Sequence, residues 1–419
     1  MDPAAVSARV SRRLVTFAFL AYVVAYIDRV NIGFAAPALQ RSLGLSATEL
    51  GIGGGLFFLG YCLFEVPSNL ILERVGARLW IARILVAWGL VSMGMALVSD
   101  TATFYAARVL LGVAEAGFFP GMVLYFTYWI PAVERAGTTA LFMIAQPVAV
   151  ILGAPLSALL LGLDGRGGLA GWQWLFIGEG LPAIALGIAA LWVLTDRPEQ
   201  AAWLSPAERD SLAARMAEER AGAVSRQTSM RAGMRSPVVW LLSGIYFLNA
   251  LVSYGVLLWL PKILHDLSGA DRWRLAAITV IPFVGATIAM IAIGRHSDRT
   301  GERRRHVAAC ALTAAAGLAL AAAVSHHLPL LVLAFTVSQM GQRSILSVFW
   351  AIPPMLLGGT AAAAGIGLIN SIGNLGGFVG PAVMGWLRDA TGAYSIGLLV
   401  LAAALVIEAA LVMRLKLRD

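Results

Sequence analysis

Long apolar runs alternate with short polar segments along the whole chain. About twelve of these runs reach the roughly 20 residues that an α-helix needs to cross a bilayer. The pattern therefore predicts twelve transmembrane helices. They are expected over approximately residues 14–38, 50–72, 79–98, 102–124, 136–162, 173–195, 238–264, 274–295, 306–325, 329–350, 362–386 and 393–413.

The longest polar segment covers residues 196–236 and divides the predicted helices into six and six. Within it, Ser205 followed by Pro206 favours the start of a helix, with serine as N-cap and proline in the first turn. We expect a cytoplasmic amphipathic helix and a linker here. The chain is thus predicted to consist of two six-helix bundles, 1–195 and 237–419, joined by segment 196–236.

The two halves resemble each other. Glu73-Arg74-Val75-Gly76 follows the second predicted helix, and Asp298-Arg299-Thr300-Gly301 follows the eighth. At nearly the same spacing, Gly153-Ala154-Pro155 in the fifth helix matches Gly380-Pro381 in the eleventh. An internal duplication of this kind is typical of transporters whose site lies between the two copies.

Composition excludes a soluble protein and places the chain in a lipid bilayer. The 419 residues are 59% hydrophobic and 13% charged, with a mean hydropathy of +0.80, and such a surface would aggregate in water. Most of the 31 lysine and arginine residues fall on the side of the chain ends, which predicts cytoplasmic termini. This bias accounts for the net charge of +8 without a nucleic-acid partner. The first apolar run is too long for a cleaved signal peptide.

Charged side chains inside the predicted helices point to a polar cavity. Asp28 and Arg29 lie in the first helix, Arg108 and Glu115 in the fourth. A charge at the bilayer centre costs roughly 3 kcal/mol even on the lenient insertion scale, so such residues are functional by default.

The second copy of the loop motif, at residues 294–304, reads Gly-Arg-His-Ser-Asp-Arg-Thr-Gly-Glu-Arg-Arg. It resembles the signature of the major facilitator superfamily; the first copy departs from it at Asn69 and Glu73. A carboxylate in this loop can cap a neighbouring helix and pair with an arginine. Opening of the transporter at this end must break that contact. We expect Glu73, Arg74, Asp298 and Arg299 to act in gating. The alternative is that the basic residues only keep this loop on the cytoplasmic side of the membrane.

Five further stretches, at 26–31, 61–70, 108–121, 171–176 and 349–353, are similar to the anion:cation symporter branch of that superfamily. The branch includes bacterial carriers for tartrate, sugar acids and aromatic acids, and is related to sialic-acid and vesicular glutamate transporters. The resemblance implies proton-coupled symport of a small organic anion by alternating access. It also implies a monomer in the bacterial inner membrane, with protons as the coupling ion, no other cofactor and no metal.

By this resemblance, Asp28 and Glu115 carry the coupling proton. A buried carboxylate whose partner changes during transport can bind a proton on one side and release it on the other. Asp28 and Arg29 point about 100° apart on a helix. We expect Asp28 to face the Arg108–Glu115 helix and Arg29 to face the substrate. A permanent structural pairing of Asp28 with Arg29 or Arg108 is the alternative.

Several other positions match polar pocket positions of the family. An arginine can hold a carboxylate by two hydrogen bonds, and tyrosines and amides can bind carboxylate or hydroxyl oxygens. Tyr61 could equally belong to an interfacial aromatic belt, and Asn370 to a helix–helix contact, as expected for Asn374. The predicted substrate-binding residues are Tyr26, Arg29, Tyr61, Arg108, Gln146, Arg343, Ser347, Trp350 and Asn370.

Arg343 departs from the family pattern, which has small residues there. Our hypothesis is that Arg343 binds a second carboxylate, so that the substrate is a dianion such as tartrate. The alternative is an arginine that reaches a helix end or an acid on another helix. Glu65, near the predicted clamp, favours a gating role, and Glu179 a structural one.

The sequence favours transport over two other classes of function. A membrane-embedded enzyme would need a nucleophile and base, or metal ligands, at membrane depth, but the five histidines all lie near predicted helix ends. A sensor that had lost transport would be expected to lose Asp28 or Glu115. Sodium coupling, exchange, and aldonate, hexuronate or aromatic acid substrates stay open.

Overall fold

The computed structural model describes residues 3–224, 236–356 and 359–415, and these residues are almost entirely helical. The first half contains α1 (Pro3–Val10), α2 (Thr16–Leu43), α3 (Ala47–Val75), α4 (Ala77–Gly94), α5 (Thr101–Glu115), α6 (Phe118–Trp129), α7 (Ala132–Met143), α8 (Ala145–Leu161) and α9 (Gly171–Val193). After α10 (Pro206–Val224), the second half contains α12 (Pro237–Ser268), α13 (Arg272–Thr300), α14 (Arg304–Ala323), α15 (Leu328–Phe349), α16 (Ile352–Leu356), α17 (Gly359–Thr391) and α18 (Ser395–Met413).

In the described residues, eleven helical segments are long and apolar enough to cross a membrane. The remaining predicted crossing is α15, which has the length but is too polar to be among them. Its polar residues Ser338, Gln339, Gln342 and Arg343 are all buried inside the protein. The low hydropathy of α15 therefore reflects side chains that face the interior.

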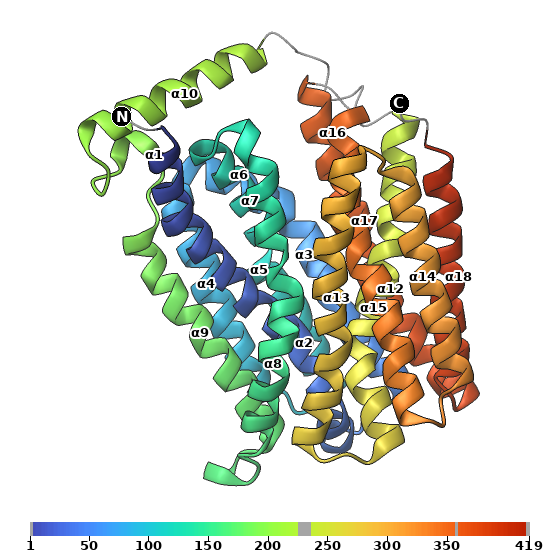
Figure 1. Cartoon of the computed structure of the whole chain (residues 1–419). Helices are drawn as coiled ribbons and strands as arrows, with labels where there is room; N and C mark the ends of the chain where they lie inside the picture. The colour runs from blue at the N-terminus through green and yellow to red at the C-terminus, as the bar shows by residue number, and fades with distance from the viewer. Residues whose placement is uncertain (1–2, 225–235, 357–358, 416–419) are drawn as a thin grey trace.

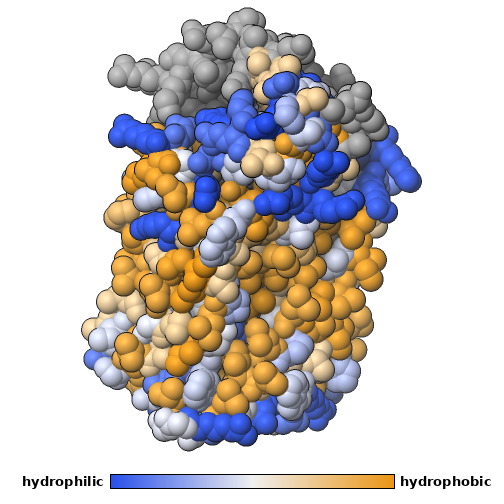
Figure 2. All heavy atoms as spheres, turned by 90° about the vertical axis from the view of Figure 1, so that its left-hand side faces the viewer, coloured by the Kyte–Doolittle hydropathy of each residue, from blue (hydrophilic) through white to orange (hydrophobic). Residues whose placement is uncertain are grey.

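The helices form two groups that stand side by side. Figure 1 shows α1, α2 and α4–α9 on one side and α12–α18 on the other, with both chain ends at the same end of the molecule. We call this the terminal end and the opposite one the far end. In the face shown in Figure 2, a broad apolar band separates hydrophilic residues at the two ends. This is the surface expected of a protein that spans a bilayer.

The predicted fourth helix is interrupted directly after Glu115. Gly117 has φ +86°, a left-handed conformation that glycine adopts without strain. An added Cβ there would also lie 2.2 Å from Ser68 Oγ. The predicted span over 102–124 is present as the crossing Thr101–Trp129, but within it α5 ends at Glu115 and α6 begins at Phe118.

Helix α10 lies across the terminal end (Figure 1). It begins at Pro206, and the N–H of Glu208 donates to Ser205 Oγ while the Glu208 carboxylate accepts from the N–H of Ser205. The predicted N-cap is confirmed, as a capping box. Glu208 also pairs with Arg9 at 3.0 Å, which joins α10 to α1. The rest of the predicted linker, residues 225–235, lies outside the described residues.

At the far end the halves are closely packed through α3 and α17. An added Cβ on Gly51 would lie 2.3 Å from the carbonyl oxygen of Pro381, and one on Gly385 would lie 2.2 Å from that of Ala47. Asp389 accepts hydrogen bonds from the backbone N–H groups of Ala47 (3.2 Å) and Thr48 (2.7 Å). A carboxylate of one half thus caps the first turn of a helix in the other.

Candidate functional site

A cavity with an empty volume of ≈ 390 Å³ lies between the two halves. Helices α2, α3, α6, α7 and α8 line it from the first half, and α12 and α17 from the second. Seven of its residues carry a phenol or an amide and one carries a guanidinium, and two phenylalanines and a methionine complete the wall. The lining comprises Tyr22, Arg29, Phe58, Tyr61, Phe119, Met143, Gln146, Tyr246, Tyr254, Asn370 and Asn374.

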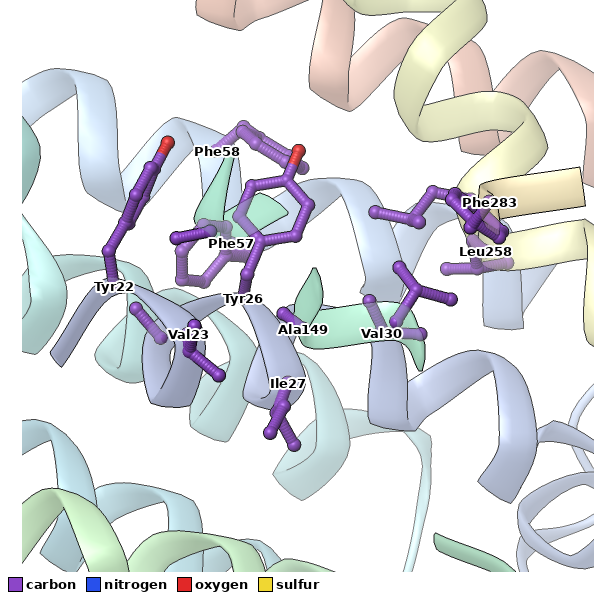
Figure 3. Close-up of a cluster of buried hydrophobic side chains, with 14 of the residues drawn as sticks. Tyr22, Val23, Tyr26, Ile27, Val30, Phe57, Phe58, Ala149, Leu258 and Phe283 are labelled. Atoms are coloured by element: carbon purple, nitrogen blue, oxygen red, sulfur yellow. The ribbon is translucent and has the colours of Figure 1, made fainter. Parts of the chain in front are cut away.

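One wall is aromatic and comes from α2. Figure 3 shows Tyr22 and Tyr26, one turn apart on this helix, with their hydroxyl groups on the same side. Their rings meet edge to face, with centroids 5.8 Å apart. The Tyr22 hydroxyl accepts a hydrogen bond of 2.8 Å from Gln146 Nε2 on α8. Gln146, one of the predicted substrate-binding residues, therefore lies in the cavity wall.

Arg29 lies in the cavity wall, but it is paired within the protein. Its Nε donates to Glu115 Oε1 at 2.9 Å, and its Nη2 contacts the same oxygen. Its Nη1 donates to the Tyr254 hydroxyl of the other half at 3.2 Å. Arg29 was expected to face the substrate; it does line the cavity, and the end of α5 also brings Glu115 directly to it.

Asp28 points away from the cavity and into the first half. It accepts hydrogen bonds from Trp88 Nε1 (3.1 Å) and Ser92 Oγ on α4, and from Asn31 Nδ2 (3.1 Å) on α2. The expectation that Asp28 faces the Arg108–Glu115 helix was therefore wrong. The rotation of α2 about its axis gives that position to Arg29.

Arg108 is buried and has no carboxylate partner in the part of the chain that the structure describes. Its donors reach the backbone carbonyls of Gly53 (3.2 Å) and Gly54 (3.3 Å) on α3, while Nη1 has no hydrogen-bond partner. It lines a second cavity of ≈ 280 Å³, together with Arg29. Arg108 thus adds positive charge beside the central site.

Arg343 on α15 is 2% exposed and crosses from the second half to the first. Its Nη1 donates to the Tyr26 hydroxyl and to Gln146 Oε1, both at 3.3 Å, and its Nε donates to Gln339 at 3.4 Å. Nη2 has no partner, and within the described residues no carboxylate forms an ion pair with this guanidinium. A buried cation of this kind is costly unless a counter-charge is supplied.

Asn370 and Glu65 link the halves at the other side of the cavity. The Asn370 Nδ2 on α17 donates to Glu65 Oε1 on α3, and both side chains are buried. Tyr61, one turn before Glu65, packs its ring 5.3 Å from the Arg29 guanidinium. Of the predicted substrate-binding residues, Arg29, Tyr61, Gln146 and Asn370 thus line the central cavity. Arg343 and Tyr26 do not line it but adjoin it, because Arg343 donates to both Gln146 and Tyr26.

Other predicted residues lie further away. Ser347 donates to the carbonyl of Ser344 within α15, and Trp350 packs edge to face on Tyr246 at 5.0 Å. Neither lines the central cavity.

Of the predicted gating residues, Glu65 lies beside the central cavity, and the other four lie at the terminal end. Asp298 pairs with Arg303 of the same half at 2.7 Å. Glu73, Arg74 and Arg299 are exposed. Glu179 accepts from Ser157, in keeping with its structural assignment.

Sequence reasoning missed two tyrosines and a buried acid. Tyr246 and Tyr254 of α12 line the cavity. The signal in the sequence was their spacing, which places both on about the same face of one helix. Glu408 of α18 is fully buried and accepts from Asn249 Nδ2 at 3.2 Å. Its position inside the last apolar run was the same signal that drew attention to Asp28.

Comparison with known proteins gives the family. The model of the Major Facilitator Superfamily matches residues 18–323 and 273–419. The chain belongs to this superfamily. It is therefore an integral membrane transporter and not an enzyme.

Among relatives, the chain is 48% identical over 403 residues to the "Putative tartrate transporter" of Agrobacterium vitis, covering 96% of this chain and 89% of that protein. It is 38% identical over 405 residues to the "Inner membrane transport protein RhmT" of Escherichia coli K12, covering 96% and 94%. A solved structure of a bacterial homologue of the human lysosomal transporter Spinster has a TM-score of 0.76 at 17% identity, with 96% of each chain covered. That likeness is one of fold.

Proposed function

We propose that this transporter is a proton-coupled symporter of a small organic anion, with a hydroxy dicarboxylate such as tartrate as the favoured substrate. The name of the 48% identical Agrobacterium vitis relative supports this choice. The lining of the central cavity suits a small polyhydroxylated acid, because phenols and amides bind hydroxyl and carboxylate oxygens. Aldonates, hexuronates and aromatic acids are the alternative substrates.

The observation that carries the dianion is the buried guanidinium of Arg343. Arg29 already has a counter-charge in Glu115, whereas Arg343 holds only neutral partners. A substrate with one carboxylate near Arg29 and one near Arg343 would supply the missing negative charge. Each charge-assisted hydrogen bond of this kind contributes about 1.5–3 kcal/mol.

Proton coupling follows from competition for Arg29. An ionised Glu115 holds the donors of this guanidinium, so it opposes binding of a substrate carboxylate there. When Glu115 takes up a proton, Arg29 becomes free to bind the anion. Asp28, surrounded by neutral donors of α4, is the second protonatable group in this scheme.

Transport would proceed by alternating access, with the bundles 1–195 and 237–419 moving against each other. In the described residues, the hydrogen bonds between the halves extend from Asp389 at the far end to Glu65. We place the protein in a bacterial inner membrane with the terminal end in the cytoplasm, as the basic residues near the chain ends favour.

Uptake into proteoliposomes tests the proposal. Labelled tartrate and a panel of sugar acids and aromatic acids are supplied with and without an inward proton gradient. We expect the gradient to stimulate tartrate uptake, and Glu115→Gln to abolish that stimulation. If the proton gradient stimulates the uptake of no transported acid, symport with protons is excluded. Stimulation by a sodium gradient would then indicate symport with sodium.

A further inference from the structure

Glu65 has no role in the scheme above, although it touches a residue of the cavity wall. It is 4% exposed and lies on α3 of the first half, while its partner Asn370, 7% exposed, lies on α17 of the second. The contact is a hydrogen bond from Asn370 Nδ2 to Glu65 Oε1. Within the described residues, Glu65 forms no ion pair with a lysine or arginine. Its bonded partner is therefore the amide of a residue that lines the cavity.

The chemistry of the two groups fixes the orientation of this amide. An ionised carboxylate can only accept hydrogen bonds, whereas a carboxamide has a donor end and an acceptor end. Glu65 therefore selects the amide nitrogen of Asn370. The planar amide then has its carbonyl oxygen left for another partner, and Asn370 lines the central cavity.

We propose that Glu65 is a positioning residue that turns the Asn370 carbonyl oxygen toward the substrate, so that this position accepts a hydrogen bond from a substrate hydroxyl. The proposal rests on the proposed transport of a hydroxy acid. It divides recognition into two parts. Arg29 and Arg343 bind carboxylates, and Asn370 distinguishes a hydroxylated acid from its unsubstituted analogue.

A site that hydrogen-bonds a substrate hydroxyl rejects an analogue that lacks this group, because its own polar atom is left unpaired. A fixed amide oxygen is such a site, because it can only accept a hydrogen bond. A carboxylate of the analogue cannot donate one and would be repelled from this oxygen. Without Glu65 the amide could rotate and offer its nitrogen to a carboxylate instead. Discrimination by the hydroxyl group would then fall while carboxylate binding persisted.

The test compares malate with succinate, which differ by one hydroxyl group. The measurement is the ratio of their concentrations for half-inhibition of labelled tartrate uptake in proteoliposomes. We expect the wild type to prefer malate, and both Glu65→Leu and Asn370→Leu to lower this preference by roughly 3- to 10-fold, the worth of one neutral hydrogen bond. The double variant should lose no more than either single variant, because both act on one interaction.

Glu65→Gln serves where Glu65→Leu fails to fold. Its side chain keeps the size of glutamate but can donate or accept, so the amide is no longer fixed, and an intermediate preference is expected.

Cys62→Ala is the matched control. Cys62 is a neighbour on α3 whose thiol donates to the carbonyl of Ser371 on α17 at 3.4 Å, so this variant also removes a contact between the halves. Its malate preference should equal that of the wild type.

Two results would overturn the proposal. One is a Glu65→Leu variant that keeps the full malate preference while Asn370→Leu loses it. The other is additive loss in the double variant. The proposed symport is judged separately, by the effect of the proton gradient, so a transporter without proton coupling could still show the predicted ratios.

Discussion

The carboxylate of Asp389 at the end of α17 accepts hydrogen bonds from both the backbone N–H and the hydroxyl of Thr48 in the first turn of α3, at 2.7 and 2.6 Å. The two residues belong to different halves of the transporter. Opening the far end requires that these bonds break. Asp389 is therefore positioned to favour the state in which the far end is closed.

We predict that Asp389→Ala shifts the protein toward the state that is open at the far end. An N-cap acceptor contributes about 0.5–2 kcal/mol, which corresponds to an approximately 2- to 30-fold change in the ratio of the two states. The half-buried Cys62 lies between the halves on the terminal side of this contact. Its labelling by a maleimide, measured in a Cys310→Ala background, should become slower as the halves approach each other there.

Asp271→Ala is the matched control for this experiment. Asp271 also caps a helix, accepting from the N–H groups of Trp273 (2.9 Å) and Arg274 (3.2 Å), but within its own half. This variant should lower the melting temperature without slowing the labelling of Cys62. Equal effects of the two variants on labelling would show that Asp389 contributes only to stability.

A second prediction concerns Arg343. Replacing it by glutamine removes the charge and keeps a hydrogen-bonding side chain. The KM for tartrate should rise by about 10- to 100-fold, as expected for a lost charge-assisted hydrogen bond, while uptake of monocarboxylates changes little. Initial rates of uptake at several concentrations provide the measurement.

Arg83→Gln controls for the loss of one positive charge. Arg83 is exposed on α4, with its guanidinium 4.6 Å from the ring of Trp80, and has no contact with the central cavity. Its variant should transport tartrate as the wild type does. An equal loss of mono- and dicarboxylate uptake in Arg343→Gln would contradict the role in dianion binding.

A third prediction concerns the buried pair of Glu408 and Asn249. Asn249→Leu removes the hydrogen-bond donor that the Glu408 carboxyl uses and should destabilise the protein by about 1–3 kcal/mol. Replacing both residues by leucine should recover most of this loss, because no polar group is then left unpaired. Thermal unfolding in detergent is the measurement. A double variant less stable than either single variant would mean that the pair serves more than packing.

The fourth prediction is a pH dependence at the terminal end. The hydrogen bond from the backbone N–H of Ser205, with the Ser205 hydroxyl and Arg9, lowers the pKa of Glu208 below its ordinary value. A carboxyl group whose pKa is lowered by folding stabilises the fold above its unfolded pKa and loses this contribution as the pH falls through its folded pKa. The first turn of α10 should therefore become less protected from hydrogen exchange below about pH 4.

Glu208→Gln distinguishes this cap from general acid effects. The neutral side chain should give weaker protection of the first turn of α10 already at neutral pH, with no further loss on acidification. The same acid-dependent loss in Glu208→Gln as in the wild type would assign the effect to other groups.

The pattern of apolar runs predicted the helices and the division into two halves, because a bilayer imposes a minimum length on each crossing. The same rule did not predict the interruption of the helix after Glu115. Helices at membrane depth normally stay continuous, and a break is tolerated only where protein surrounds it. Gly117 and Pro120 were visible in the sequence, but the packing of Ser68 against Gly117 was not.

The site shows the same limit. Neighbouring residues such as Asp28 and Arg29 must point in different directions, and the sequence predicted this much. Which of them meets Glu115 depends on the rotation of α2, which packs mainly against α8, α9 and α12. Tyr254, which accepts from Arg29, comes from the other half, and pairing across such a distance in the chain cannot be inferred from spacing along one helix.

The glycines between α3 and α17 bear on how easily the transporter can work. Where Gly51 and Gly385 meet the opposite helix, backbone touches backbone. Such a contact has no side chains that must change rotamer when it opens, and its separation exposes little apolar side-chain surface to water. The contact between α3 and α17 at the far end can therefore be close and still require little free energy to separate. The modest binding free energy of one small anion and a proton then suffices to shift the equilibrium between the closed and open states of the far end.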